Sequence, residues 1–355
     1  MEEEAMKALR GLGVLFTISL LVFPTSAAPY WVKPGVYIEY IAQRYDPYIE
    51  TQISHGTKLE SVTTASILYF RNGTEYWVDS YNDTLIKFKI LGESGEYFVV
   101  GVIIELKNVT IKFSLHNGTS APAFWESTDM LSTSKRVSAD GEVSVKVKLR
   151  SLRIFGEYRI RKRDGMVFGI DGRPYGHTFL WINPNETPKG NDTFVVLPTL
   201  NWTMKVERVS AMDKPKKTYY GEFGPPTAIL SLMGPPLVIK GRLEFTTQTP
   251  GGICYDPATG MVLSPTTLSI LISPDLAAIG IPFASFMDER VAYDQMVKGN
   301  PMWAGLLPLY DTNAEFQRVE EVPFSKAKTP WKYAFWGSLV LLGSIMTAKG
   351  WRKSK

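Results

Sequence analysis

A strict alternation of apolar and polar residues constrains the fold of this chain more than any other feature. In the stretch EVSVKVKLR, Glu142 to Arg150, one side carries Val143, Val145, Val147 and Leu149, and the other carries Ser144, Lys146, Lys148 and Arg150. A period of two is typical of an antiparallel strand with one buried and one solvated face. The pattern recurs in Thr84–Ile90, Val109–Leu115 and Gly241–Thr246. The sequence therefore predicts a protein built mainly from β-strands.

Tight-turn dipeptides follow these strands at hairpin distance. They are Asn72-Gly73, Asn117-Gly118, Asp140-Gly141, Asp164-Gly165 and Asp171-Gly172. Such pairs tolerate the positive φ angles of a type I′ turn. Helical patterns are sparse until Ser273–Lys298, where an Asp-rich start and an apolar stretch broken by Pro282 predict one or two short helices. We expect curved antiparallel sheet, as a half-barrel or a sandwich, with a short helical insertion near residues 273–298.

The N-terminus has the layout of a signal peptide. Lys7 and Arg10 precede an apolar run from Leu12 to Phe23, and small residues follow up to Ala28. The run is only about a dozen residues, short for a bilayer core of about 30 Å. We predict a signal peptide over residues 1–27, cleaved after Ala27, with a retained N-terminal anchor as the alternative.

The C-terminus has the layout of a membrane anchor. Residues 333–348 carry no charge and are followed by Lys349, Arg352, Lys353 and Lys355, which predicts a transmembrane helix over 331–348 and a cytoplasmic basic tail over 349–355. A buried terminal helix is the alternative. Between the two ends, residues 28–165 and 166–328 are predicted to be two β-rich parts of an extracellular region, forming one domain or two. The predicted location is the cell membrane, crossed once.

Asparagine usage supports an exported chain. Seven of its ten asparagines begin an Asn-x-Thr sequon: Asn72, Asn82, Asn108, Asn117, Asn185, Asn191 and Asn201. This excess predicts N-glycosylation at exposed positions. Asn72 and Asn117 stand in predicted hairpin turns, and Asn185 is the weakest site because Pro188 follows its Thr.

Composition narrows the source and excludes one class of partner. Cys254 is the single cysteine, so no intrachain disulfide can form, although secreted domains of this size usually contain them. Many Lys, Glu and Tyr residues beside few amides indicate a heat-adapted archaeon. The balance of 39 basic and 35 acidic residues argues against a nucleic-acid partner.

Four segments in order resemble a known group of proteins. They are DGRPYGHTFLWINP, TMKVERV, CYDPATGMVLS and LYDTNAEF, which precede a terminal hydrophobic segment. In this order the chain is similar to a group of poorly characterised archaeal exported proteins that are β-rich and membrane-anchored. The resemblance spans residues 30 to 320 and implies fold and location, but no activity.

The sequence contains no catalytic, metal or cofactor motif. Its three histidines, His55, His116 and His177, are far apart and lack partners at ligand spacing. We therefore predict no catalytic residue, no metal site and no cofactor. In GGICYDPATGMVLS, Asp256 and Thr259 could face a cation, but a reverse turn is the preferred interpretation because one carboxylate is too few for calcium.

Three surfaces are candidates for contact with partners. Two basic rows, expected on neighbouring strands, would form one positive face for anionic lipid or polysaccharide, with an ordinary solvated face as the alternative: Lys146, Lys148, Arg150, Arg159, Arg161 and Arg163. An apolar group would line a lipid cavity or touch the membrane, with core packing as the alternative: Leu276, Ile279, Ile281, Phe283, Phe286 and Met287. Small residues in the predicted anchor would pack against a partner helix: Gly337, Ser338, Gly343 and Ser344.

These observations predict a non-catalytic, membrane-anchored accessory or interaction subunit that binds another envelope component, with a membrane or envelope protein as the expected partner. One alternative is a half-barrel carrier or sensor of a lipid or other hydrophobic ligand. Another is an exported hydrolase, for which Asp288, Glu289 and Asp294 are the densest acids.

Overall fold

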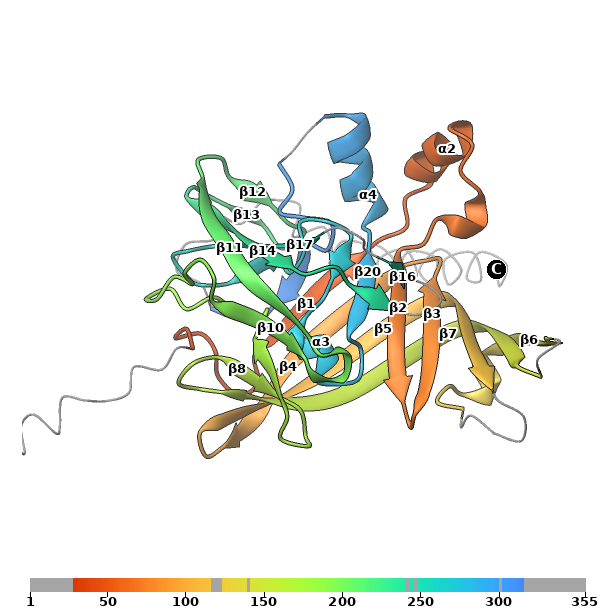
Figure 1. Cartoon of the computed structure of the whole chain (residues 1–355). Helices are drawn as coiled ribbons and strands as arrows, with labels where there is room; N and C mark the ends of the chain where they lie inside the picture. Colours follow the sequence, from red (N-terminus) through yellow and green to blue (C-terminus); the bar gives the residue numbers. More distant parts are fainter. Residues whose placement is uncertain are drawn as a thin grey trace, which may run out of the picture.

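Two long strands form the spine of the molecule. In this computed structural model, which describes residues 28–115, 123–138, 141–239, 243–244, 248–299 and 302–315, β5 (Tyr97–Leu115) and β7 (Val143–Arg161) pair antiparallel over their whole length. Each is longer than its other neighbours and so has two partners in succession along its free edge (Figure 1). β5 pairs with β4 (Thr84–Ser94) and β3 (Thr74–Ser80); β7 pairs with β6 (Met130–Val137) and β8 (Met166–Phe168).

The remaining strands extend the sheet from this spine. From β4 it continues to β1 (Tyr37–Ala42) and β21 (Leu309–Thr312). From β3 it continues to β2 (Ala65–Arg71), β20 (Phe283–Phe286) and β19 (Ile270–Leu271). From β8 it continues to β9 (Pro174–His177), β10 (Thr193–Leu197), β11 (Trp202–Met212), β14 (Thr227–Gly234), β17 (Thr249–Tyr255) and β18 (Val262–Ser264). Two small ribbons stand apart: β12 (Lys216–Lys217) with β13 (Glu222–Phe223), and β15 (Val238–Ile239) with β16 (Leu243–Glu244).

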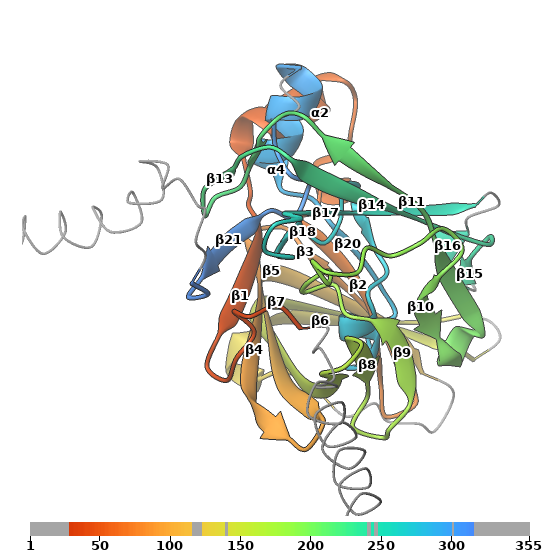
Figure 2. The ribbon, with the colours of Figure 1, turned by 90° about the vertical axis from the view of Figure 1, so that its left-hand side faces the viewer.

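The sheet curls into a half-barrel, which confirms the predicted mainly-β, curved antiparallel architecture (Figure 2). The curl brings the β18 end back toward the first and last strands. Tyr40 of β1 donates its hydroxyl hydrogen to the carbonyl of Val262 at 2.9 Å, and Ser264 Oγ donates to the carbonyl of Leu307 at 3.0 Å. The apolar faces of all these strands meet in one core inside the curl.

A short helix, α3 (Pro274–Ala277), lies within the curl (Figure 1). Its buried Asp275 accepts hydrogen bonds from the Tyr158 hydroxyl at 2.7 Å, the Thr178 hydroxyl at 2.7 Å and the Phe179 N–H at 2.6 Å. Burial raises the pKa of Asp275, and these donors oppose that rise. One carboxyl group therefore joins α3 to β7 and to the chain that follows β9.

Two further helices lie side by side at one end of the half-barrel (Figures 1 and 2). They are α2 (Asp46–Ser54) and α4 (Glu289–Ala292), and α4 continues as a π-helical turn over Tyr293–Val297. A separate apolar cluster joins them, with Tyr48 from α2, Val291 from α4 and Trp303 from the chain after α4. The sequence did not predict α2, because its nine residues carry no clear apolar periodicity.

Several predictions can now be placed on the fold. The boundary at 165/166 falls in the turn between β7 and β8, which are adjacent strands of one sheet. Segment 273–298 holds α3 and α4, but also strand β20, which the sequence did not predict. The predicted signal peptide (1–27), transmembrane helix (331–348) and tail (349–355) lie outside the described residues. Among the described residues, no helix is long and apolar enough to cross a membrane.

Candidate functional site

A basic groove of about 850 Å³ lies where the turn after α2 faces strands β5 and β7. Five of its lining side chains are cationic, and no acidic residue lines it: Arg44, Lys58, Lys112, Lys146 and Lys148. The other lining residues are Leu59, Tyr81, Asn108 and Thr110. Two of the five cations, Lys146 and Lys148, belong to the first basic row predicted from the sequence.

The strand register explains why these cations meet. Lys112 of β5 is directly opposite Lys146 of β7, and Thr110 is opposite Lys148. Residues opposite each other in an antiparallel pair project to the same face. On the other side of β7, the register places Ser134 and Ser132 of β6 opposite the two lysines. Each lysine therefore has neutral or basic neighbours on both sides.

Two other cross-strand positions of the same sheet carry opposite charges. Glu39 of β1 is opposite Lys87 of β4, with 3.6 Å between the charged atoms, and Glu105 of β5 is opposite Arg153 of β7 at 2.5 Å. Like charges placed directly opposite destabilise a strand pair, whereas opposite charges support it. Lys112 and Lys146 instead place two positive charges directly opposite each other, and of the two only Lys112 forms an ion pair, with Asp79 of the next strand.

Two of the groove cations are held by carboxylates that do not line it. Arg44 Nη1 lies 3.0 Å from Glu289 Oε1, and Lys112 Nζ lies 2.7 Å from Asp79 Oδ2. Lys58, Lys146 and Lys148 are exposed and form no ion pair with any residue in the described ranges. The groove thus combines two positioned cations with three that are free to meet an anion.

The second predicted basic row does not join this groove. Arg159 and Arg161 lie on the same strand as Lys146, rather than on a neighbouring strand, so that expectation is wrong. Arg150 and Arg159 are separated by nine steps of about 3.3 Å, or about 30 Å along β7. Arg161 also forms a two-pronged ion pair with Asp164, and Arg163 lies 3.6 Å from the same carboxylate. The two rows therefore do not make one positive face.

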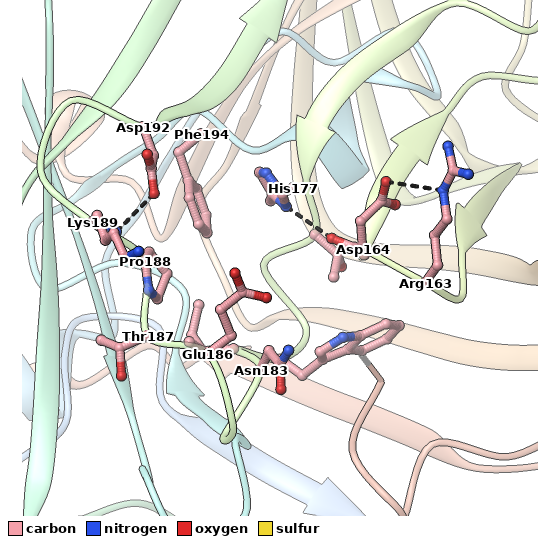
Figure 3. Close-up of a pocket in the computed structure, with 14 residues that line it drawn as sticks. Arg163, Asp164, His177, Asn183, Glu186, Thr187, Pro188, Lys189, Asp192 and Phe194 are labelled. Carbon is pink, nitrogen blue, oxygen red and sulfur yellow. Dashed lines mark hydrogen bonds and ion pairs between the residues drawn. The ribbon is translucent and has the colours of Figure 1, made fainter. Parts of the chain in front are cut away.

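A second cavity, of about 380 Å³, opens beside the β8–β9 hairpin (Figure 3). His177, the end of β9, lies between Phe194 and Asp164, and Glu186 rises from the facing loop. The sequence analysis did not single out this pocket. Its lining residues come from a 32-residue stretch whose recognisable patterns, turn dipeptides and two sequons, do not indicate a pocket, and only the fold of the loop after β9 brings them together.

The six sequon asparagines within the described ranges are all exposed: Asn72, Asn82, Asn108, Asn185, Asn191 and Asn201. Four of them, Asn72, Asn108, Asn191 and Asn201, have positive φ angles, a conformation that Asn tolerates better than most residues. Backbone geometry is therefore a second reason for asparagine at these four positions. Asn117 lies outside the described residues, and glycosylation itself stays a prediction.

The apolar residues suggested for lipid or membrane contact belong mostly to the core. Leu276, Ile281, Phe283 and Phe286 are buried, whereas Ile279 and Met287 are partly buried. Neither the groove nor the pocket is lined by any of the six. Gly337, Ser338, Gly343 and Ser344, suggested for helix pairing, lie outside the described residues.

The acids proposed for a hydrolase are committed to other contacts. Asp288 accepts the N–H of Gln43 and Val291, Glu289 accepts the N–H of Tyr45, and Asp294 accepts the indole N–H of Trp303. In the part of the chain that the structure describes, no three His, Cys, Asp or Glu residues gather to hold a metal ion.

The carboxylate of Asp256 is also occupied by hydrogen bonds, all from residues of its own turn. Its carboxylate accepts the Thr259 hydroxyl at 2.6 Å and the N–H groups of Ala258 and Thr259, within the turn that joins β17 and β18. The preferred interpretation of this stretch as a reverse turn is confirmed.

No family model matches this chain, and neither a curated protein nor a solved structure is detectably similar to it.

Proposed function

We propose that this protein is a non-catalytic, membrane-anchored protein of the cell surface, and that its basic groove binds an anionic component of the envelope. The observation that carries the proposal is the gathering of Lys58, Lys146 and Lys148, none of which forms an ion pair in the part of the chain that the structure describes, around one groove without lining acids. The proposed signal peptide and C-terminal helix would place the groove outside the cell.

The shape of the groove favours a polymer chain over a bilayer. A bilayer presents a broad surface, whereas a hollow lined by cations admits a narrow polyanion such as an acidic polysaccharide. Asn108 lines the groove, and Asn82 is close to it because the N–H of Tyr81 donates to the carbonyl of Asn108 at 3.1 Å. A glycan on Asn82 would hold a flat membrane away from the groove, whereas binding of a polymer requires Asn108, which lines the groove, to carry none.

The expected affinity is modest and salt-dependent. Exposed ion pairs contribute about 0.2–1 kcal/mol each, and salt screens such pairs strongly. Three free cations therefore support binding that depends on repeated charges along the ligand and weakens as NaCl is added. This behaviour separates a charged groove from an apolar one.

The test is binding of full-length protein to dextran sulfate and, separately, to vesicles that contain anionic lipid. The double variant Lys146→Glu, Lys148→Glu should lose binding to dextran sulfate. The double variant Arg159→Glu, Arg208→Glu is a matched control, since it reverses two exposed cations of the same sheet that lie outside the groove. Equal losses in both variants would refute the groove, and binding confined to vesicles would replace the polysaccharide with a membrane.

The two alternatives have weaker support. A hydrophobic carrier would have to displace Leu276, Ile281 and Phe286 from the packed core. An exported hydrolase would need acids other than Asp288 and Glu289, whose carboxylates already accept backbone hydrogen bonds.

A further inference from the structure

The pocket in Figure 3 has the construction of a small-molecule site. Its volume of about 380 Å³ lies within the roughly 300–1,000 Å³ of such sites. One wall is the turn Arg163–Gly165 with His177, and the other is the loop from Asn183 to Asp192. The buried rings of Trp181 and Phe194 contribute apolar surface to the lining.

His177 is oriented by two contacts. Its Nδ1 lies 3.0 Å from the carbonyl oxygen of Asp164, and its ring stacks on Phe194 at 5.3 Å between centroids. A carbonyl oxygen only accepts hydrogen bonds, so Nδ1 carries the hydrogen. In the neutral ring, Nε2 is then an acceptor. It has no hydrogen-bond partner among the residues that the structure describes.

The turn that holds His177 is itself fixed. Asp164 accepts the Arg161 guanidinium at 3.0 and 2.6 Å, and accepts the Met166 N–H at 3.1 Å. Burial would raise the pKa of Asp164, but these hydrogen bonds outweigh burial and lower it. Asp164 stays charged and occupied, so it supports the wall of the pocket and leaves ligand contacts to others.

Glu186 and Asn183 supply the opposite polar contacts. Figure 3 shows the Glu186 side chain pointing toward His177 and Phe194. Glu186 is exposed, and its carboxylate forms no hydrogen bond or ion pair within the described ranges. Asn183 Oδ1 accepts the N–H of Asn185 at 3.0 Å, which leaves its amide hydrogens to donate.

Charge defines the kind of ligand. The lining contains three acidic residues, Asp164, Glu186 and Asp192, and two basic residues, Arg163 and Lys189. An anionic ligand would meet Glu186, and a cationic ligand would meet the two basic side chains. A neutral molecule with several hydroxyl groups can instead donate to Nε2 and the carboxylate, accept from the amide, and rest its carbon face on the rings.

We propose that this pocket binds a neutral saccharide of one or two units, with His177 Nε2 and the Glu186 carboxylate accepting its hydroxyl hydrogens. This ligand is distinct from the polyanion assigned to the basic groove. Failure of one of the two binding proposals would leave the other intact.

The experiment is saturation-transfer NMR and calorimetry on full-length protein with a panel of neutral mono- and disaccharides. The protein is made in a host that does not N-glycosylate and held in a detergent without a sugar headgroup, so that no other saccharide competes. Glu186→Gln should weaken binding by up to about tenfold, since the amide oxygen can still accept a hydroxyl hydrogen but without the charge that strengthens the bond. His177→Phe keeps the ring on Phe194 but removes Nε2, and should weaken binding similarly.

Two controls make the result decisive. Glu75→Gln alters an exposed carboxylate of β3, which does not line this pocket, and should bind as the wild type does. The groove variant Lys146→Glu, Lys148→Glu should also keep its saccharide affinity. Wild-type protein that binds no neutral saccharide at millimolar concentration would overturn the proposal. So would binding that survives both pocket substitutions, or that Glu75→Gln weakens equally.

Discussion

Among single residues, Asp288 couples stability to pH. It is fully buried, and burial raises its pKa from 3.8 to about 7, against the opposing hydrogen bonds from the N–H groups of Val291 and Gln43. The folded protein therefore binds more protons than the unfolded chain between these two values, so the free energy of unfolding falls as pH rises from about 4 to 7. A shift of this size corresponds to about 4 kcal/mol.

The variant Asp288→Asn cannot titrate at this position. We expect urea unfolding to give a flatter pH profile for it between pH 4 and 7 than for the wild type. Its stability should be lower throughout, because the amide has one oxygen whereas the carboxylate uses Oδ1 for Val291 and Oδ2 for Gln43. Asp213→Asn, at an exposed position, should keep the wild-type profile. Parallel profiles for Asp288→Asn and the wild type would show that Asp288 does not titrate in this range.

At Asn108, the effect of backbone geometry on stability can be measured separately from the effect of glycosylation. It has a φ of 53° within β5 and begins a sequon. Asn108→Gly and Asn108→Ala both destroy the sequon, but only Ala is strained at this φ, by about 1 kcal/mol. Unfolding in urea, with both proteins made without glycans, should find the Ala variant less stable by that amount. Equal stability of the two variants would mean that the backbone relaxes there.

Among the elements, β7 and the residues that follow α3 pack so closely that a side chain larger than that of glycine does not fit between them. A Cβ atom on Gly156 of β7 would lie 2.5 Å from Cγ2 and 2.6 Å from Cβ of Ile279, which follows α3. Gly156→Ala should therefore destabilise the protein by about 1–3 kcal/mol. In an Ile279→Gly background both clashing atoms are gone, and the same substitution should be nearly neutral. Additive losses in this double-mutant cycle, measured by thermal unfolding, would place the strain elsewhere.

The same strand shows where sequence reasoning succeeds and where it stops. The alternation from Val143 to Arg150 correctly predicted a half-buried strand, but β7 continues to Arg161 with its buried positions changed from odd to even numbers between Leu149 and Leu152. The change occurs where the β5–β7 pairing passes over Asn108, and where the other neighbour of β5 changes from β4 to β3. A change of partner leaves no periodic signal, so one strand was interpreted as two.

At the scale of the whole molecule, both sites depend on long-range assembly. The alternation placed Lys146 and Lys148 on one face, but Arg44, Lys58 and Lys112 reach the groove only through the fold. Nothing in the local sequence marks Glu186 and His177 either, because only the fold of the loop after β9 places both in one pocket. Sequence patterns report local periodicity, and they carry no signal for contacts between residues that are far apart in the chain.

The pairing of the first strand with the last gives a prediction about how cooperatively the protein unfolds. β1 pairs with β21, about 270 residues away, and Thr312 of β21 donates its hydroxyl hydrogen to the carbonyl of Tyr37 at 2.6 Å while accepting the N–H of Ala314 at 3.1 Å. Thr312→Val keeps the shape but removes both hydrogen bonds, which should cost about 1–3 kcal/mol. Because one sheet links both halves of the chain, the loss should appear throughout it.

Hydrogen exchange followed by mass spectrometry would measure this spread. Under native conditions, Thr312→Val should accelerate exchange of the slowest amides equally in β1, β5 and β14, as expected for one cooperative unit. Thr133→Val, on the exposed strand β6, should leave all three unchanged. Acceleration confined to β14 and its neighbours would show instead that residues 28–165 and 166–328 unfold as two units, because the strands of the first part would then keep their protection when β21 is weakened.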